Sequence, residues 1–283
     1  MVNPAARRRA VHWFREQFPF SERRACRLAA VSRSTARYVS TRDDTELSQR
    51  ILELAAQRPR FGYRRIYDLL HRQGLRVNVK RVHRIYRELQ LAVRRKKRKR
   101  VAQASRRPRQ VPLRANEQWS MDFMSDSLAD GRTFRTLNVI DEATRESLVI
   151  EVDTSLGGHR VVRVLDCLVE QRGKPSRIVI DNGTEFTSKA LDQWAYRNQV
   201  ELVFIRPGRP IENCLVESFN GRFRDECLNL HWFTTLAEAR RIIEAWREDY
   251  NQSRPHSSLG GQTPAEFAAQ IAERDEVGKD VAA

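Results

Sequence analysis

The sequence is poor in cysteine and has no long apolar run. Its four cysteines, Cys26, Cys167, Cys214 and Cys227, form no C-x-x-C pair and have no cluster of histidines beside them. This pattern argues against a disulfide framework and a zinc site, so we expect four reduced, mostly buried thiols and no zinc. No segment approaches the roughly 20 apolar residues that a transmembrane helix needs, and no signal-peptide core follows the basic N-terminus. We expect an intracellular protein.

Basic residues outnumber acidic ones, but only in the first part of the chain. The 283 residues carry a formal net charge of +16. Residues 1–115 hold 32 Lys and Arg against 8 Asp and Glu, a net of +24, whereas residues 116–283 hold 20 against 28, a net of −8. The first part predicts a polyanionic partner, either nucleic acid or an acidic membrane surface. The acidic part cannot hold DNA by bulk charge and needs a local device, such as bound cations.

The stretch SERRACRLAAVSRSTARYVS predicts a helix, a turn and a second helix capped by Ser32 or Ser34. This is the spacing of a helix-turn-helix, in which Arg33 and Arg37 would face outward and contact DNA. A helical hairpin that only packs against its neighbours is the alternative. We assign residues 1–45 to a helix-turn-helix DNA-binding module.

A second helical DNA-binding module is predicted over residues 46–93. The stretch RPRFGYRRIYDLL mixes arginines with aromatic residues around a glycine, a composition suited to contact with a nucleic-acid backbone. A solvated turn whose aromatic side chains enter the core explains the same composition. The candidates for DNA contact here are Arg60, Tyr63, Arg64 and Arg65.

Seven consecutive cations follow this module. Because the run lacks apolar periodicity, it predicts a basic linker over residues 94–115 that is disordered when free. A run of charge is usually just solvated, but its place between a helical module and an acidic domain favours a path along phosphates. These predicted DNA contacts are Arg94, Arg95, Lys96, Lys97, Arg98, Lys99 and Arg100.

From residue 116 the pattern changes to strands and helices. Three successive strand-like segments with short connections predict an antiparallel meander. A buried strand SRIVID, a helix over residues 189–198 and a strand VELVFIRP follow, which predicts an α/β sheet with helices on its faces. We assign residues 116–230 to this core and residues 231–283 to C-terminal helices and a tail that complete it.

Two aspartates lie on predicted strands of this core. Asp122 lies within WSMDFM, where alternation places it opposite Trp119, Met121 and Phe123. Asp181 ends the apolar run IVI, at the strand-end position where open α/β sheets place their ligand groups. We expect both carboxylates at one edge of the sheet.

A third acid, Glu217, follows Asp181 after 35 intervening residues and lies on a predicted helix. At 100° per residue, this helix has a polar face and a buried stripe. The polar face holds Glu217 with Asn213, Asn220, Gly221 and Arg224. The buried stripe holds Val216, Phe219, Phe223 and Cys227.

Three carboxylates within a few ångströms would repel by about 4 kcal/mol per close pair at an effective dielectric near 20, so they need compensating charge. Hard oxygen ligands select Mg²⁺ or Mn²⁺. Two such ions could activate an attacking hydroxyl and stabilise the leaving oxygen. The predicted catalytic and metal-binding residues are therefore Asp122, Asp181 and Glu217, with Arg224 as a phosphate contact and Asn213 and Asn220 beside them as DNA contacts.

The same residues carry a resemblance to a known family. Asp122, Asp181 in DNGTEF, Glu217 after a gap of 35 and the basic Arg224 resemble the D,D-35-E signature of retroviral integrases and bacterial transposases. More narrowly, WSMDFM, IENCLVESFNGRFRDECLN and YNQSRPHSSLGGQTP resemble the second-reading-frame (OrfB) transposase of two-frame insertion sequences. The resemblance implies a ribonuclease-H-like core with a mixed five-stranded sheet flanked by helices. It also implies recognition of terminal inverted repeats, and DNA cleavage and joining with Mg²⁺.

The resemblance has further consequences for partners and for the N-terminus. It implies a homo-oligomer on terminal-repeat and target DNA, acting in the cytoplasm at the bacterial nucleoid and without a membrane partner. The resembled enzyme is often fused to an upstream-frame (OrfA) protein, so that protein is a further candidate partner. Retroviral integrases carry an N-terminal zinc module, whereas His12 and Cys26 here have no companions at ligand spacing. A helix-turn-helix replaces that module.

Other residues and functions compete with this interpretation. Asp141 ends a strand and is expected to cap a turn, and Glu185 is expected to stay solvated or pair with a cation. His256 in RPHSSLGG is expected to stabilise a turn or contact DNA. A ribonuclease-H-fold nuclease that cleaves without joining, and an inactive DNA-binding regulator, are the rival functions.

Overall fold

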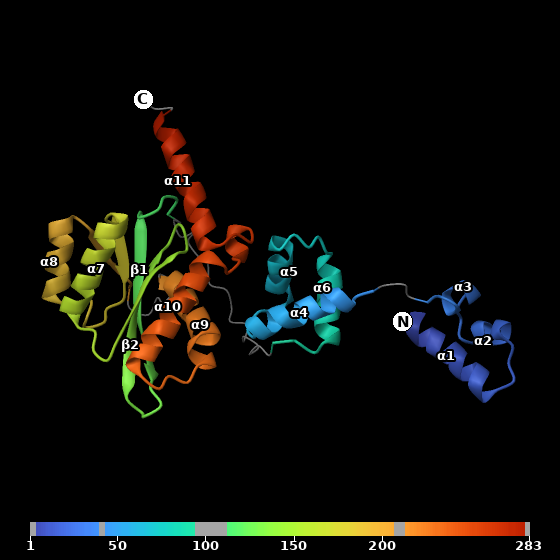
Figure 1. The fold of residues 1–283 in the computed structure, drawn as a ribbon. Coiled ribbons are helices and arrows are strands. Elements are labelled where there is room, and N and C mark those ends of the chain that lie inside the picture. The colour runs from blue at the N-terminus through green and yellow to red at the C-terminus, as the bar shows by residue number, and fades with distance from the viewer. Residues whose placement is uncertain (1–3, 40–42, 94–111, 207–212, 281–283) are drawn as a thin grey trace. The chain divides into compact units, whose positions relative to one another are not determined.

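The computed structural model describes residues 4–39, 43–93, 112–206 and 213–280 (Figure 1). The chain divides into two compact units, Met1–Leu52 and Glu53–Ala283, and the division falls inside helix α4. Each unit is considered by itself. The predicted cationic run at residues 94–100 lies outside the described residues.

The first unit begins with three short helices, α1 (Pro4–Gln17), α2 (Glu22–Leu28) and α3 (Arg33–Ala36). Ser32 caps α3 as predicted, because its hydroxyl accepts a hydrogen bond from the N–H of Thr35 at 3.1 Å. However, α3 ends after one turn. It is therefore shorter than the recognition helix that the helix-turn-helix prediction requires.

The second unit contains the α/β domain together with two helices that precede it in the chain. Its elements after α4 (Thr45–Gln57) are α5 (Tyr63–Arg72), α6 (Val79–Glu88), β1 (Gln118–Ser127), β2 (Thr133–Asp141), β3 (Ser147–Asp153), α7 (Gly158–Arg172), β4 (Arg177–Ile180), α8 (Lys189–Asn198), β5 (Glu201–Phe204), α9 (Cys214–Glu226), the 3-10 helix η2 (Leu228–Leu230), α10 (Leu236–Gln252), the 3-10 helix η3 (Ser257–Leu259) and α11 (Pro264–Asp280).

The five strands form one mixed sheet in the order β3-β2-β1-β4-β5. The first three strands are antiparallel to one another, as the short connections predict. Strands β4 and β5 add in parallel, each after a helix that crosses one face of the sheet. This is the mixed five-stranded sheet flanked by helices that the resemblance implies.

Each face of the sheet has its own apolar core. One core contains Trp119 and Met121 of β1 packed with α7 and α8, and the other contains α9 and α10 packed on β2 and β3. Alternation along β1 therefore sends Trp119 to the first face and leaves Asp122 toward the second. The predicted stripe on α9 is confirmed, because Val216, Phe219, Phe223 and Cys227 are all buried.

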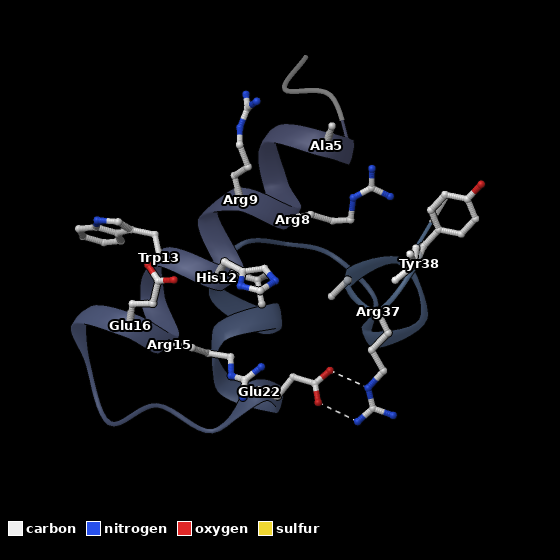
Figure 2. Close-up of a pocket in the computed structure, with 13 residues that line it drawn as sticks. Ala5, Arg8, Arg9, His12, Trp13, Arg15, Glu16, Glu22, Arg37 and Tyr38 are labelled. Atoms are coloured by element: carbon white, nitrogen blue, oxygen red, sulfur yellow. Dashed lines mark hydrogen bonds and ion pairs between the residues drawn. The ribbon is translucent and has the colours of Figure 1, made fainter. Parts of the chain in front are cut away.

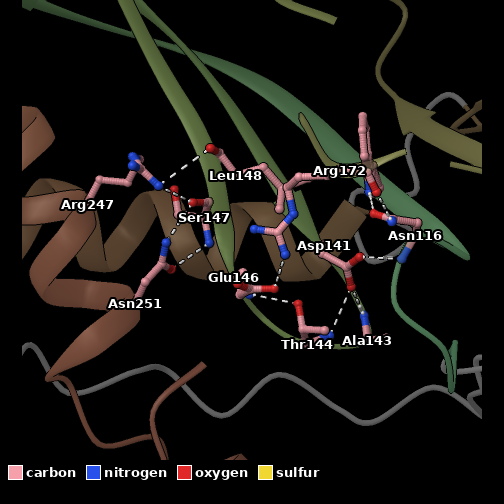
Figure 3. Close-up of polar contacts among 11 residues, drawn as sticks. Asn116, Asp141, Ala143, Thr144, Glu146, Ser147, Leu148, Arg172, Arg247 and Asn251 are labelled. Atoms are coloured by element: carbon pink, nitrogen blue, oxygen red, sulfur yellow. Dashed lines mark hydrogen bonds and ion pairs between the residues drawn. The ribbon is translucent and has the colours of Figure 1, made fainter. Parts of the chain in front are cut away.

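The turn between β2 and β3 is built on a buried acid (Figure 3). Asp141 accepts hydrogen bonds from the N–H groups of Asn116, Ala143 and Thr144 at 2.7, 2.8 and 2.9 Å. The prediction that Asp141 caps a turn is confirmed. Three backbone donors bind its two oxygens, so this carboxylate has a structural role in the turn.

The cysteines and the length of the helices complete the description of the fold. The cysteines are free, but only Cys26 and Cys227 are buried, whereas Cys214 is half-buried and Cys167 is exposed, so the prediction of mostly buried thiols holds for two of the four. In the parts of the chain that the structure describes, no helix has both the length and the apolar character to cross a membrane.

Candidate active site

The pairing of β1 with β4 brings the two aspartates to the same level of the sheet. Trp119 pairs with Ile178 and Ser120 with Val179 in parallel register. Extending this register by two residues places Asp122 opposite Asp181, where neighbouring strands lie about 4.8 Å apart. Asp122 lies within β1 and Asp181 directly follows the neighbouring strand β4, as the sequence predicts for two carboxylates at one sheet edge.

Helix α9 places the third acid beside them. The Asn220 side chain donates from Nδ2 to Oδ2 of Asp122 at 2.7 Å, and Glu217 lies three residues earlier on the same helix. Residues three apart share one helix face, so Glu217 is directed to the side of α9 that contacts Asp122. Glu217 itself is exposed to solvent.

A buried asparagine on β2 holds this arrangement in place. Asn138 is opposite Asp122 in the β1–β2 register, is fully buried, and donates from Nδ2 to Oδ1 of Asn220 at 2.7 Å. Its bond fixes the orientation of the Asn220 amide, which then presents its N–H to Asp122. The sequence reasoning missed Asn138. The signal was available, because strand alternation puts a polar Asn138 on the same face as Ser120 and Asp122.

The electrostatics of Asp122 reflect the approach of the other two acids. Burial, together with the negative charges of Asp181 and Glu217, raises the pKa of Asp122 from 3.8 to about 6, against the opposing hydrogen bonds from Phe123 and Asn220. The carboxylates of Asp181 and Glu217 are thus close enough to disfavour the ionisation of Asp122. Excess negative charge at such a point is the condition that a bound cation relieves.

The donor chemistry fits a hard divalent cation, but the acids are not arranged as a ready metal site. Oxygen atoms of three carboxylates are the ligands that Mg²⁺ and Mn²⁺ select. Among the described residues, however, no three His, Cys, Asp or Glu side chains form a group that could hold a metal. Asp122 Oδ1 accepts from the N–H of Phe123 at 2.8 Å, and Asp181 Oδ1 accepts from the N–H of Gly183 at 2.9 Å. Metal binding by these acids therefore stays a prediction.

A cation does lie close to this edge of the sheet. Arg135 of β2 forms an ion pair with Glu185, and its guanidinium lies 4.5 Å from the centre of the Phe123 ring. The prediction that Glu185 pairs with a cation is confirmed. Because Glu185 is engaged in this ion pair, it is not a free carboxylate that could replace one of the three candidate acids.

The predicted DNA contacts on α9 are corrected by their burial. Asn213 is 2% exposed and donates to the carbonyl of Met121, and Asn220 is 8% exposed and holds Asp122. Neither amide faces solvent, so they position the site rather than contact DNA. Arg224 is partly exposed, and its Nη2 donates to the carbonyl of Ser125 at 2.8 Å.

The predicted contacts near α5 divide in the same way. Arg60 pairs with Asp225, and Arg65 donates to Glu226 at 2.7 Å, so both arginines contact α9, and their contact with DNA stays a prediction. The ring of Tyr63 packs against His83, with 4.4 Å between ring centroids. Arg64 is exposed and keeps its place as a candidate DNA contact.

In the first unit, the predicted contact Arg37 borders a basic and aromatic cavity of about 570 Å³ (Figure 2). Arg37 donates from Nε and Nη2 to Glu22 at 2.8 and 2.7 Å, so its guanidinium is engaged within the protein. Arg33 is exposed. The rings of Trp13 and Tyr38 flank this cavity and are about half exposed.

Glu226 lies at the end of α9, nine residues beyond Glu217, and its carboxylate is buried and paired with arginines. Glu226 accepts from Arg65 at 2.7 Å and from Nε and Nη2 of Arg254 at 2.7 and 2.8 Å. Burial opposes its ionisation, but the bonds and charges of Arg254 and Arg65 outweigh burial and lower its pKa. The Arg254 side chain is 2% exposed. This carboxylate is a structural anchor between α5, α9 and the loop after α10.

His256 completes this anchor. The ring nitrogen Nε2 of His256 lies 3.2 Å from Nη1 of Arg254. The backbone N–H of His256 donates to the carbonyl of Gln262 at 2.9 Å. Burial and the charge of Arg254 lower the pKa of His256 to about 2, so the ring is neutral and Nε2 accepts the bond. Of the two predicted roles, stabilising a turn is the one that these bonds confirm.

Comparison with known proteins places the chain in a family. The Integrase core domain family matches residues 112–210, and a second match with the same description covers residues 198–264. The HTH-like domain family matches residues 41–99, which is the second predicted module rather than the first. A simian T-cell lymphotropic virus intasome chain has a similar fold, with a TM-score of 0.52 and 14% identity over 77% of this chain and 74% of that one.

Sequence relatives make the family specific. The "Insertion element IS407 uncharacterized 31.7 kDa protein" of Burkholderia multivorans is 50% identical over 258 residues, which cover 90% of this chain and 93% of the relative. The Escherichia coli "Transposase InsD for insertion element IS2D" is 29% identical over 245 residues, with 81% and 80% covered. The chain belongs to the insertion-element transposases with an integrase core, and its function is DNA transposition and integration.

Proposed function

We propose that Asp122, Asp181 and Glu217 are the catalytic carboxylates of this transposase, and that they hold Mg²⁺ or Mn²⁺, two ions being expected. The observation that supports the proposal is the environment of Asp122 on β1: burial, and the negative charges of Asp181 after β4 and Glu217 on α9, raise its pKa to about 6. A bound divalent ion would supply Lewis-acid activation of the attacking hydroxyl and charge stabilisation of the leaving oxygen.

The residues around the acids have separate tasks in this proposal. Asn220 holds Oδ2 of Asp122, and Asn138 holds Asn220, so the carboxylate is oriented before substrate arrives. Preorganised ligands lose little conformational entropy on binding. Asp181 is positioned by the turn at Gly183, whose N–H binds Oδ1. Glu217 is exposed, which leaves it accessible to the phosphodiester and to cations.

The proposed substrates are the terminal inverted repeats of the element and target DNA. The basic segment at residues 1–115, with a net charge of +24, supports this proposal, and the exposed Arg33 and Arg64 are its described candidates for contact. Joining two ends to one target requires more than one active site, so we propose a homo-oligomer on DNA, with an upstream-frame protein as a further partner. The oligomer would act on DNA in the bacterial nucleoid.

A strand-transfer assay with Asp181→Asn tests the assignment. Wild-type protein, terminal-repeat DNA and Mg²⁺ should yield a nicked end and then a joined product, and the variant should lose both by about a thousandfold or more because a metal ligand is gone. DNA binding should be retained or stronger, since one negative charge is removed. Undiminished joining by the variant would refute the assignment, and cleavage by wild type without any joined species would favour the nuclease.

A further inference from the structure

The cavity of the first unit lies against α1 and is bordered by more cations than acids (Figure 2). Arg8, His12 and Arg15 recur at intervals of four and three residues, so they share one face of the helix. The charged side chains that line the cavity are Arg8, Arg9, Arg15, Arg37, Glu16 and Glu22. Four arginines therefore accompany two glutamates.

One of these two acids is already neutralised within the protein. Glu22 forms an ion pair with Arg37 at 2.7 Å. The hydrogen bond from Arg37 lowers the pKa of Glu22, and the charges of Arg15 and Arg33 lower it further. The three lining arginines of α1 then have Glu16 as the second acid of the cavity. The balance of charge favours an anionic ligand.

Two aromatic rings border the cavity and are only partly covered. Trp13 is 51% exposed and Tyr38 is 53% exposed. Trp13 makes T-shaped contacts with Phe14 and Phe18, with ring centroids 5.4 and 5.7 Å away. Figure 2 shows Arg8 extending toward Tyr38, and its guanidinium carbon lies 5.4 Å from the centre of that ring. Neighbours therefore hold both rings while about half of each side chain faces solvent.

The lengths of the helices and the exposed rings distinguish between two forms of DNA. Helix α3 has four residues, which is too short for a recognition helix in the major groove of a duplex. Bases in a duplex are stacked on one another and present only their edges to a protein. The bases of an unpaired strand can stack on aromatic side chains while cations bind the backbone. Exposed rings among arginines therefore fit a single strand better than a duplex.

We infer that this cavity binds single-stranded DNA, with bases stacked on Trp13 and Tyr38 and with phosphates bound by Arg8, Arg9 and Arg15. The ligand class rests on the proposed function, because cutting one strand of a duplex can free it from its complement. The main wall of the site is α1, which lies outside the segment that predicted a helix-turn-helix. Stacking and phosphate contact give affinity here without reading the base sequence.

The first test measures the affinity of the full chain, in metal-free buffer, for an oligo(dT) strand and for a duplex of the same length. Trp13→Ala should weaken binding of the strand by about tenfold, because one stacked base is lost, and should change duplex binding by less than about twofold. Trp232→Ala is the matched control, since Trp232 is 78% exposed but belongs to the second unit. Equal affinities of the two variants for oligo(dT) would overturn the inference.

Arg15→Gln tests the contact with phosphate. The affinity for oligo(dT) is measured over a range of NaCl concentrations. The slope of log K against log salt should become shallower by about 0.7, the value for one phosphate contact on a single strand. Arg23→Gln removes an exposed arginine of α2 that does not line the cavity, and it should keep the wild-type slope. The same slope in both variants would contradict phosphate binding at α1.

Tryptophan fluorescence locates the stacked base. The chain has five tryptophans, and stacking of a base on an indole ring quenches its emission. Oligo(dT) should quench wild type and Trp232→Phe, and it should quench Trp13→Phe much less. Trp13→Phe keeps an aromatic ring against Phe14 and Phe18, which guards against a loss of fold. Undiminished quenching of Trp13→Phe would place the bases elsewhere on the protein.

Contact between two copies of the chain is the competing use of exposed rings. Sedimentation velocity without DNA tests it. If Trp13→Ala abolishes self-association while its affinity for oligo(dT) equals that of wild type, the surface serves protein contact and does not bind DNA. None of these readouts requires strand transfer. A protein that bound oligo(dT) through Trp13 but failed to join DNA would keep this site and lose only the catalytic assignment.

Discussion

Two acids on one helix, Glu217 and Glu226 of α9, are in opposite electrostatic environments. Glu217 is exposed, and its negative charge, after burial and together with that of Asp181, raises the pKa of Asp122 to about 6. Glu226 is buried between Arg65 and Arg254, which lower its own pKa. The comparison teaches that the helix is anchored at its C-terminal end by paired charge, and carries an acid without an ion pair among the described residues at the proposed catalytic position.

Glu217→Gln should give the largest effect, a loss of strand transfer by about a thousandfold or more, because the third carboxylate contributes to cation binding in the proposed mechanism. Stability should not fall, since the substitution removes repulsion on Asp122. The measurement is single-turnover joining of terminal-repeat DNA alongside urea unfolding. Full activity with reduced stability would reverse the roles assigned to the two ends of α9.

Glu226→Gln should mainly affect stability. The change leaves the guanidinium of Arg254, 2% exposed, without its counter-ion, and breaking a buried pair in this way costs about 3 kcal/mol or more. The measurement is the free energy of unfolding in urea, with Arg197→Gln as an exposed control. An unfolding free energy equal to that of wild type would show that the anchor contributes nothing.

The two ends of α9 should respond to pH with opposite sign. The folded-state pKa of Asp122 is raised from 3.8 to about 6, so its contribution to stability is fully present below 3.8 and is lost as pH rises through 6. The pKa of Glu226 is lowered from 4.5, so its contribution is present above 4.5 and is lost as pH falls through the lowered value.

This pH dependence is measured as the free energy of unfolding at a series of pH values in metal-free buffer. The stability of Asp122→Asn relative to wild type should increase between pH 4 and pH 6. The difference in free energy of unfolding between wild type and Glu226→Gln should become smaller as the pH falls. Parallel pH profiles for the two variants would contradict the contrast between the two sites.

Asn138→Ala should have the smallest effect of the four, a loss of joining of about tenfold. The change frees Oδ1 of Asn220, so the amide that holds Asp122 loses its fixed orientation. Thr136, buried on the same strand, provides the matched control as Thr136→Val, which keeps shape and leaves the Asn220 bond untouched. Equal losses in both variants would indicate damage to the β2 core instead of a specific effect on Asp122.

Much of the fold and of the candidate site could be predicted from local pattern. Period-two alternation around Asp122, the apolar run ending at Asp181 and the helical stripe through Phe219 each depend on residues a few positions apart. Such patterns identified the strands, the buried face of α9 and the three acids. The mixed sheet followed from the resemblance together with these segments.

The surroundings of the predicted DNA contacts could not be predicted in the same way. Arg60 and Arg65 were predicted to contact DNA from their local composition, but they pair with Asp225 and Glu226, more than 160 residues away in the chain. Asn213 and Asn220 share a helix face with Glu217, yet they are buried because β1 covers them. Local composition does not specify which distant group will cover or pair with a side chain.

By itself, the sequence determined which residues could carry the chemistry, because strand and helix periodicity and the types of side chain are local properties. Tertiary structure alone decided which of those groups are paired. It placed two arginines on Glu226, it gave Glu217 no ion pair with any described residue, and it put Asn138 behind Asn220. Ionisation and hydrogen bonding depend on desolvation and on neighbours within a few ångströms, and only the packed fold determines those neighbours.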